Sequence, residues 1–119
     1  MNEITLTPES ADVLSSLCKE YRKRVKHGMS KFDAANFDSS KAIHRDLFPK
    51  WTFDDLDEAC TELWKAGLLD GFRADGYLYQ ASLSDAGISF NQYRASKTFS
   101  TFFALLKELA QAILSHWPF

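Results

Sequence analysis

The chain has 119 residues, of which 45% are hydrophobic and 25% charged, and its formal net charge is −2. This length and composition predict one globular domain with a substantial core and exclude a disordered chain. The charge excludes a domain that attracts nucleic acid over its whole surface, so any such binding must come from a local patch.

The two cysteines, Cys18 and Cys60, lie far apart, and each sits inside a helical apolar pattern. Because this spacing is not that of a disulfide framework or of a CxxC metal site, we predict that both are small core residues. The first ten residues lack a basic start followed by an apolar run, so we expect no signal peptide. These features favour a cytoplasmic protein.

The first predicted helix begins after Thr7. Thr7 can cap the helix, Pro8 suits its first position, and Glu9 complements the positive end of the helix dipole. Apolar residues then recur at spacings of three and four and predict one buried face, and Gly28 ends the helix. This buried face consists of Val13, Leu14, Leu17, Cys18, Tyr21 and Val25.

The other face of this helix is basic towards its C-terminal end, where Glu20 is the opposing acid. One interpretation is a set of solvated cations, which are favourable at a helix C-terminus. The other is a patch that binds a phosphate backbone or an acidic partner. The candidate patch comprises Lys19, Arg22, Lys23, Arg24 and Lys26, beside His27, together with Lys41 and Arg45 from the next helix.

Residues 29–40 contain two phenylalanines among small and polar residues, and they predict either a short strand or an irregular crossing over the core. A second helix is predicted to begin at Ser39 or Ser40, with serine as its cap, and to run to Phe48. Pro49 ends it, because the residue before a proline is pushed out of the helical region.

Thr52 is the predicted cap of a third helix, which Gly67 closes. Leu56 and Leu63 belong to its apolar face, which we expect to pack on the core. The side chains predicted to be exposed on this helix are Asp54, Asp55, Asp57, Glu58, Thr61, Glu62 and Lys65.

A β-hairpin follows, with strands predicted at residues 68–74 and 77–83. Asp75 and Gly76 separate the strands, and this dipeptide favours a tight two-residue turn because both central positions need positive φ. The Ser-Asp-Ala-Gly sequence at residues 84–87 marks the exit from the hairpin.

Residues 97–117 are strongly amphipathic and predict a last helix. Its apolar stripe consists of Phe99, Phe103, Leu106, Ala110, Ile113 and Trp117. The stripe either packs on its own domain or forms a seam in which two copies of the helix pair, since two-fold dimers are the commonest oligomers. Charged residues interrupt the run and its polar face is poor in lysine and arginine, which disfavours both a membrane span and an interfacial membrane helix.

Three stretches carry a resemblance to a known family: LWKAGLLDGF, DGYLYQASLS and LSDAGISFNQY. In them a third helix ends at a glycine and enters a hairpin, whose second strand ends in a Leu-Ser-x-x-Gly motif that opens another helix. Over residues 7–93 this order resembles the winged helix-turn-helix superfamily, including small phage or prophage proteins with a helical C-terminal extension.

The resemblance implies an α+β, mostly helical fold. A winged helix-turn-helix domain with a two-stranded β-hairpin wing would occupy residues 1–93. An extra amphipathic helix at residues 94–119 would pack on it or form the dimer seam, within a single domain overall. The resemblance also implies a recognition role for the third helix.

Winged helices serve DNA binding and protein binding alike, so the fold does not choose between them. Five acids and one base on the third helix are unfavourable in a major groove lined by phosphates, and Arg73 at the predicted wing tip is offset by Asp75. We therefore expect a non-enzymatic regulatory or adaptor module that recognises another protein and self-associates through its C-terminal helix. The alternative is a dimeric transcriptional regulator that binds duplex DNA.

No cluster of residues predicts catalysis. His27, His44 and His116 lie in separate elements without partners at the spacing of a helical metal site, and the five glycines are dispersed rather than gathered in a phosphate-binding loop. We expect no enzyme activity, metal, cofactor, small-molecule substrate or membrane partner.

Overall fold

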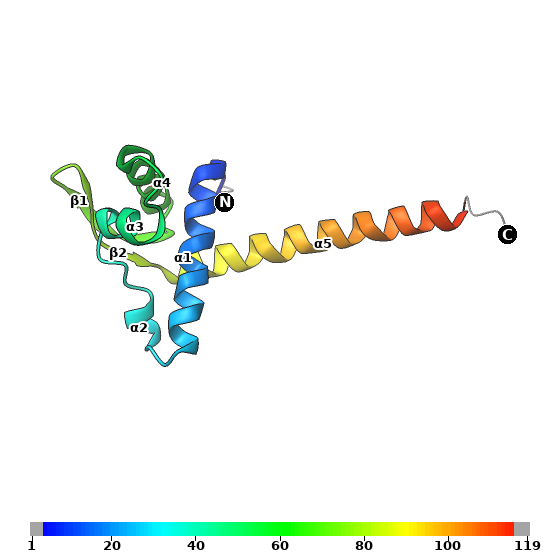
Figure 1. Ribbon diagram of the computed structural model, residues 1–119, viewed down its shortest axis with the longest axis horizontal. Helices are drawn as coiled ribbons and strands as arrows, with labels where there is room; N and C mark the ends of the chain where they lie inside the picture. Colours follow the sequence, from blue (N-terminus) through cyan, green and yellow to red (C-terminus); the bar gives the residue numbers. More distant parts are fainter. Residues whose placement is uncertain (1–3, 116–119) are drawn as a thin grey trace.

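The computed structural model describes residues 4–115, and it describes the side chains of this range except those of 98–103 and 112–115. In chain order the elements are α1 (Pro8–Lys26), α2 (Lys31–Ala34), α3 (Ser40–Leu47), α4 (Phe53–Lys65), β1 (Leu69–Ala74), β2 (Tyr77–Leu83) and α5 (Asp85–Ser115). Figure 1 shows α1 to α4 and the hairpin gathered into one body, from which α5 extends. The fold is mostly helical α+β, as predicted.

The predicted N-caps of α1, α3 and α4 are confirmed. The side-chain oxygens of Thr7, Ser39 and Thr52 accept hydrogen bonds from the backbone N–H three residues later, at 3.3, 3.1 and 3.2 Å respectively. Gly28 and Gly67 follow α1 and α4 with φ of +99° and +79°, the left-handed conformation that often ends a helix. Local signals therefore set these boundaries.

The segment between α1 and α3 combines a helical turn with strand-like pairing. Ser30 caps α2, a single turn that the sequence did not predict. The chain then runs beside β2, where Asn36 pairs with Ser82 and Ser39 pairs with Tyr79 as isolated bridges. The crossing therefore holds α3 against the hairpin.

The antiparallel hairpin turns at Asp75 and Gly76, which have φ of +50° and +84° and confirm the predicted two-residue turn. Asp70 pairs with Ser82 and Phe72 with Tyr79, so β2 holds one extra residue opposite Gly71, and this bulge shifts the register of the two strands. The indole N–H of Trp64 on α4 donates to the Gly71 carbonyl oxygen at 3.0 Å, which joins the hairpin to α4.

The core lies where α1, α3 and α4 meet the hairpin. Leu14, Leu63 and Leu78 come from three of these elements and are fully buried. Cys18 and Cys60 are also buried and unpaired, as predicted, and burial raises the pKa of their thiols to about 11 and about 12 respectively. Both thiols are therefore protonated at neutral pH.

α5 begins earlier than the amphipathic run at residues 97–117 suggests, because Ser84 caps it. The Ser84 hydroxyl accepts a hydrogen bond from the Gly87 N–H at 3.0 Å and donates one to the Gly67 carbonyl oxygen at 2.7 Å. The predicted boundary between residues 93 and 94 therefore falls inside one continuous helix.

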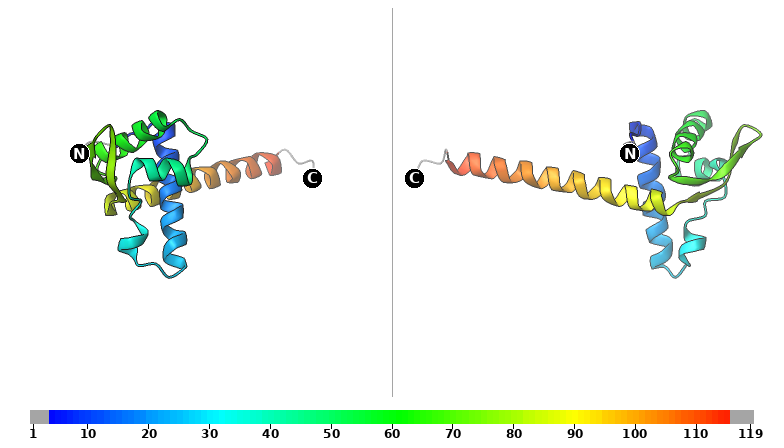
Figure 2. Two further views of the ribbon diagram at one scale, coloured as in Figure 1. Left: turned by 60° about the vertical axis from the view of Figure 1, so that its left-hand side comes forward. Right: turned by 180° about the vertical axis from the view of Figure 1, so that it is seen from behind.

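Both views in Figure 2 show the C-terminal part of α5 projecting from the domain, whereas its first turns lie beside α1. The principal extents of 68 × 35 × 32 Å reflect this projecting helix. Within the described ranges, none of the helices combines the length and the apolar composition needed to cross a membrane.

Candidate interaction surfaces

The exposed face of α4 is smaller than predicted, because Asp57 is not part of it. Asp57 is 8% exposed. Its carboxylate accepts a hydrogen bond from the Ser40 hydroxyl at 2.8 Å, and its Oδ2 lies 3.0 Å from Arg73 Nη2 in an ion pair. The prediction that Asp57 is exposed is wrong because α3 and β1 both pack on this side of α4.

The Arg73 side chain binds α4 and is not free at the tip of the hairpin. Its guanidinium donates to Asp57 and to the Thr61 hydroxyl, and the Thr61 hydroxyl donates to the Asp57 carbonyl oxygen at 2.8 Å. Ser40 adds a second link, because its hydroxyl oxygen accepts a hydrogen bond from the Leu78 N–H at 3.1 Å. We call Ser40, Asp57, Thr61 and Arg73 the Asp57 network. It ties the hairpin to α3 and α4.

Glu62, another predicted member of the exposed face, binds the N-terminus of α1. Its carboxylate accepts hydrogen bonds from the Ser10 hydroxyl at 2.7 Å, from the Thr7 N–H at 3.0 Å and from the Thr7 hydroxyl at 3.0 Å. These bonds, first of all the one from Ser10, lower the pKa of the Glu62 carboxyl group. Glu62 thus holds α1 against α4.

Three acids remain exposed on the N-terminal half of α4, namely Asp54, Asp55 and Glu58, and we call them the acidic face. Lys65 is exposed at the other end of the helix, and Thr61 is half-buried. The excess of acid over base on α4 therefore persists, but it is smaller than the sequence predicts.

Four cations of α1 form a second surface, which we call the basic stripe. Its members are Lys19, Arg22, Lys23 and Lys26. All four are exposed and recur at i, i+3, i+4 and i+7, so they share one helix face. A groove beside the stripe reaches Leu47 of α3 and His27. Glu20, which also lines this groove, is paired with Arg24, with 3.4 Å between Oε1 and Nε.

Arg24 has a structural role, whereas the sequence placed it in the candidate patch. Its guanidinium lies 4.4 Å from the centroid of the Phe37 ring, and Nη1 donates to the carbonyl oxygens of Ala34 and Asn36 at 3.3 and 3.0 Å. These contacts hold the crossing at residues 29–40 against α1.

Lys41 and Arg45, the other predicted members of the patch, are exposed on α3. The Lys41 ammonium lies 4.2 Å from the centroid of the Tyr77 ring on the hairpin. Arg45 Nε donates to the Asp46 carboxylate at 2.8 Å. Because each cation has a local partner, neither extends the basic stripe with an unpaired charge.

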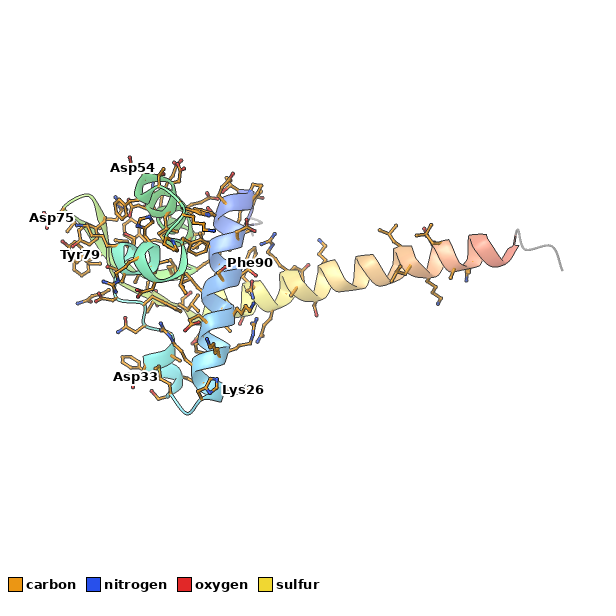
Figure 3. All side chains as sticks on the ribbon, in the orientation of Figure 1. Lys26, Asp33, Asp54, Asp75, Tyr79 and Phe90 are labelled. Atoms are coloured by element: carbon orange, nitrogen blue, oxygen red, sulfur yellow. The ribbon has the colours of Figure 1, made fainter. Side chains whose placement is uncertain are left out.

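Figure 3 shows how far apart the charged surfaces lie. Asp54 of the acidic face is at the top of the domain, and Lys26 of the basic stripe is at the bottom. Asp75 and Tyr79 mark the hairpin on the side away from α5. The domain therefore presents opposite charges at opposite ends.

The third surface is an apolar run on α5. Leu105, Leu106 and Leu109 are 54%, 47% and 60% exposed, and Ala110 is exposed beside them. The other members of the predicted seam, Phe99, Phe103, Ile113 and Trp117, lie outside the described side chains. A contiguous run of exposed apolar side chains is typical of a surface that a partner covers.

The two histidines that the structure describes, His27 and His44, lie in different elements. His27 is exposed at the end of α1, and His44 is half-buried with its Nε2 2.7 Å from the Trp51 carbonyl oxygen. His116 lies outside the described residues. Over residues 4–115, three or more potential metal-binding side chains do not gather in any group.

Comparison of the chain with protein-family models, with curated proteins and with solved structures finds no match.

Proposed function

We propose that this chain is a non-enzymatic regulatory or adaptor module that recognises another protein and self-associates through α5. The observation that carries the proposal is the run of exposed leucines on a helix that leaves the domain. Apolar side chains in such a run lose their contact with water when a second helix covers them, and this is the main driving force of association.

The order of α3, α4 and the hairpin supports assigning the domain to the winged helix-turn-helix superfamily. The junction after the hairpin adds detail to this resemblance. A Cβ atom at Gly87 would overlap the backbone carbonyl group of Leu68, so the Leu-Ser-x-x-Gly motif requires its glycine for close packing. The motif therefore sets the angle at which α5 leaves the hairpin.

The acidic face supports a protein partner rather than a nucleic acid. Asp54, Asp55 and Glu58 lie on the helix for which the superfamily resemblance implies a recognition role. Carboxylates repel a phosphate backbone, whereas they complement a basic protein surface.

Sedimentation equilibrium tests the self-association through α5. We expect a dimer or a larger assembly at micromolar concentration, and at least about a hundredfold weaker association when Leu106→Asp and Leu109→Asp are combined. Each leucine contributes roughly 1.5–3 kcal/mol when it is buried, and aspartate would also bring a charge into the seam.

Gln111→Asp is the control for added charge, because it places one of the two negative charges that the double variant gains at an exposed position of α5 away from the leucines. This variant should associate like the unchanged chain. A monomer at high micromolar concentration, or equal association of all three proteins, would contradict self-association through the leucine run.

A second candidate function, a dimeric regulator that binds duplex DNA, is favoured by the basic stripe. Its four cations share one face, and the acid beside them is paired with Arg24. Asp57 is paired with Arg73, which neutralises one of the charges that opposed DNA binding, whereas Glu62 keeps its charge and is held by Ser10 and Thr7. On this alternative, α1 rather than α4 contacts the phosphates.

Binding to duplex DNA at graded salt separates the two functions. If the DNA regulator is correct, affinity falls steeply with salt, and combining Arg22→Ala, Lys23→Ala and Lys26→Ala lowers the slope of log K against log salt by about 3. Lys65→Ala and Lys107→Ala serve as controls outside the stripe. Absence of salt-dependent binding in the unchanged chain would leave the protein-binding module as the function.

A further inference from the structure

The exposed leucines of α5 lie on the same helix face as the residues that pack on the domain. Leu105, Leu106 and Leu109 follow Gly87, Ile88 and Asn91 by 18 residues each. At 3.6 residues per turn this separation is about five complete turns, so each leucine stands in line with one residue at the start of the helix. These six residues therefore mark a single continuous face.

The first part of this face is covered by the chain's own domain. Gly87 lies directly against the Leu68 backbone, Ile88 packs on the core, and Asn91 is 7% exposed. α1 contacts these first turns and crosses them in Figure 1. Beyond these turns the described side chains of α5, at residues 92–97 and 104–111, are all exposed, and that of Tyr93 is 63% exposed.

We propose that α5 pairs antiparallel with α5 of a second copy of this chain, so that each domain lies beyond the free end of the partner helix. The proposal rests on the proposed self-association and specifies its geometry. The occupant of the leucine face is thus the same face of a second α5.

A parallel pair is blocked by the position of the domain. Packed helices lie 8–10 Å apart, so a second helix on the leucine face would run straight towards α1 and the hairpin of the first copy. In a parallel pair both domains would sit at the same end and on the facing sides of the two helices. They would then occupy the same space.

An antiparallel pair meets no such obstacle. Residues 93–115 of α5 extend about 34 Å beyond the domain at 1.5 Å per residue. Two such stretches, centred on residues 105–109, bring the leucines of both copies together. Each free end then stops near the point where the partner helix leaves its own domain.

Distance measurement between spin labels tests the orientation. Ser96 and Gln111 are exposed and point away from the leucine face, so Ser96→Cys and Gln111→Cys place one label per chain without filling the seam. Cys18 and Cys60 are buried with raised thiol pKa values and should not react with the label in the folded protein. Pulsed electron paramagnetic resonance then measures the distance between the two copies.

For antiparallel helices we expect the Ser96→Cys distance to exceed the Gln111→Cys distance by at least about 10 Å, because position 96 lies farther from the centre of the pair. When Leu106→Asp and Leu109→Asp are added, the signal from labels on two copies should disappear at both positions, because the copies separate. Equal, short distances at the two positions would establish a parallel pair and overturn this proposal while self-association stands. No intermolecular distance, together with a monomer in sedimentation, would overturn both.

Discussion

Replacing Gly87 with alanine should destabilise the domain by about 3 kcal/mol, as measured by urea unfolding. The new Cβ atom would come closer to the Leu68 carbonyl oxygen than packed atoms tolerate, and this neighbour is backbone that cannot turn away. In an unobstructed helix the same substitution would be stabilising by roughly 1 kcal/mol, because alanine favours the helix over glycine. Whether Gly87→Ala lowers or raises the free energy of unfolding therefore tests the close approach of α5 to Leu68, which lies between α4 and β1.

Gly28→Ala is the matched control for this substitution. Gly28 has a φ of +99°, and an added Cβ would meet nothing within 4 Å. The expected loss is about 1–2 kcal/mol from the left-handed backbone conformation. A Gly87→Ala domain that is as stable as the unchanged one, or more stable, would show that α5 does not pack against Leu68 as described.

Asp57→Ala should cost about 3 kcal/mol of unfolding free energy, because it leaves the Ser40 hydroxyl without its acceptor and the Arg73 guanidinium without its carboxylate partner. In a double-mutant cycle with Arg73→Ala, we expect a coupling of about 1–3 kcal/mol. Urea unfolding of the two single variants and the double variant supplies the measurement.

The exposed pair of Arg45 and Asp46 provides the comparison for that cycle. Its atoms lie closer together, with 2.8 Å between Nε and Oδ1 against 3.0 Å for the Asp57 and Arg73 pair, but both side chains face solvent. We expect no measurable coupling in the Arg45→Ala and Asp46→Ala cycle, because water screens the charges. Equal coupling in the two cycles would contradict the structural role of the Asp57 network.

The helices and the hairpin could be predicted because their boundaries depend on local chemistry. Thr7, Ser39 and Thr52 cap helices through hydrogen bonds that reach only three residues along the chain. Asp75 and Gly76 provide the positive φ that the turn requires, independently of what packs around it. Signals of this kind survive in an isolated sequence.

The polar side chains of the candidate surfaces were harder to place, because their partners are distant in sequence. Helical periodicity assigns Asp57 and Glu62 to the solvent side of α4, yet Arg73 and Ser10 reach them from β1 and α1. Arg24 similarly finds its acceptors in the crossing after α2, a segment that the sequence left open. The sequence shows only that each of these charged residues lies at the edge of a predicted apolar helix face. It does not show which distant residue binds the charge.

The family resemblance implied the start of α5, because its Leu-Ser-x-x-Gly motif opens a helix, whereas hydrophobic periodicity alone placed the last helix later. The amphipathic pattern is strongest after residue 97, whereas the first turns contain glycine, serine and asparagine. These small and polar residues fit because α5 passes close to the backbone at Leu68. Close packing against the Leu68 backbone therefore determines the sequence of the first turns of α5, and hydrophobic periodicity becomes visible only after residue 97.

The Trp64 contact with Gly71 also bears on the free edge of the hairpin. In the described residues β1 pairs with a strand on one side, which leaves its other edge open to backbone pairing with another molecule. The indole N–H already donates to the carbonyl oxygen of Gly71, and the bulge of β2 opposite Gly71 makes the hairpin irregular at this position. The Trp64 bond and the bulge therefore disfavour strand addition at the free edge of β1, so this edge does not compete with the exposed leucines of α5 as a contact surface.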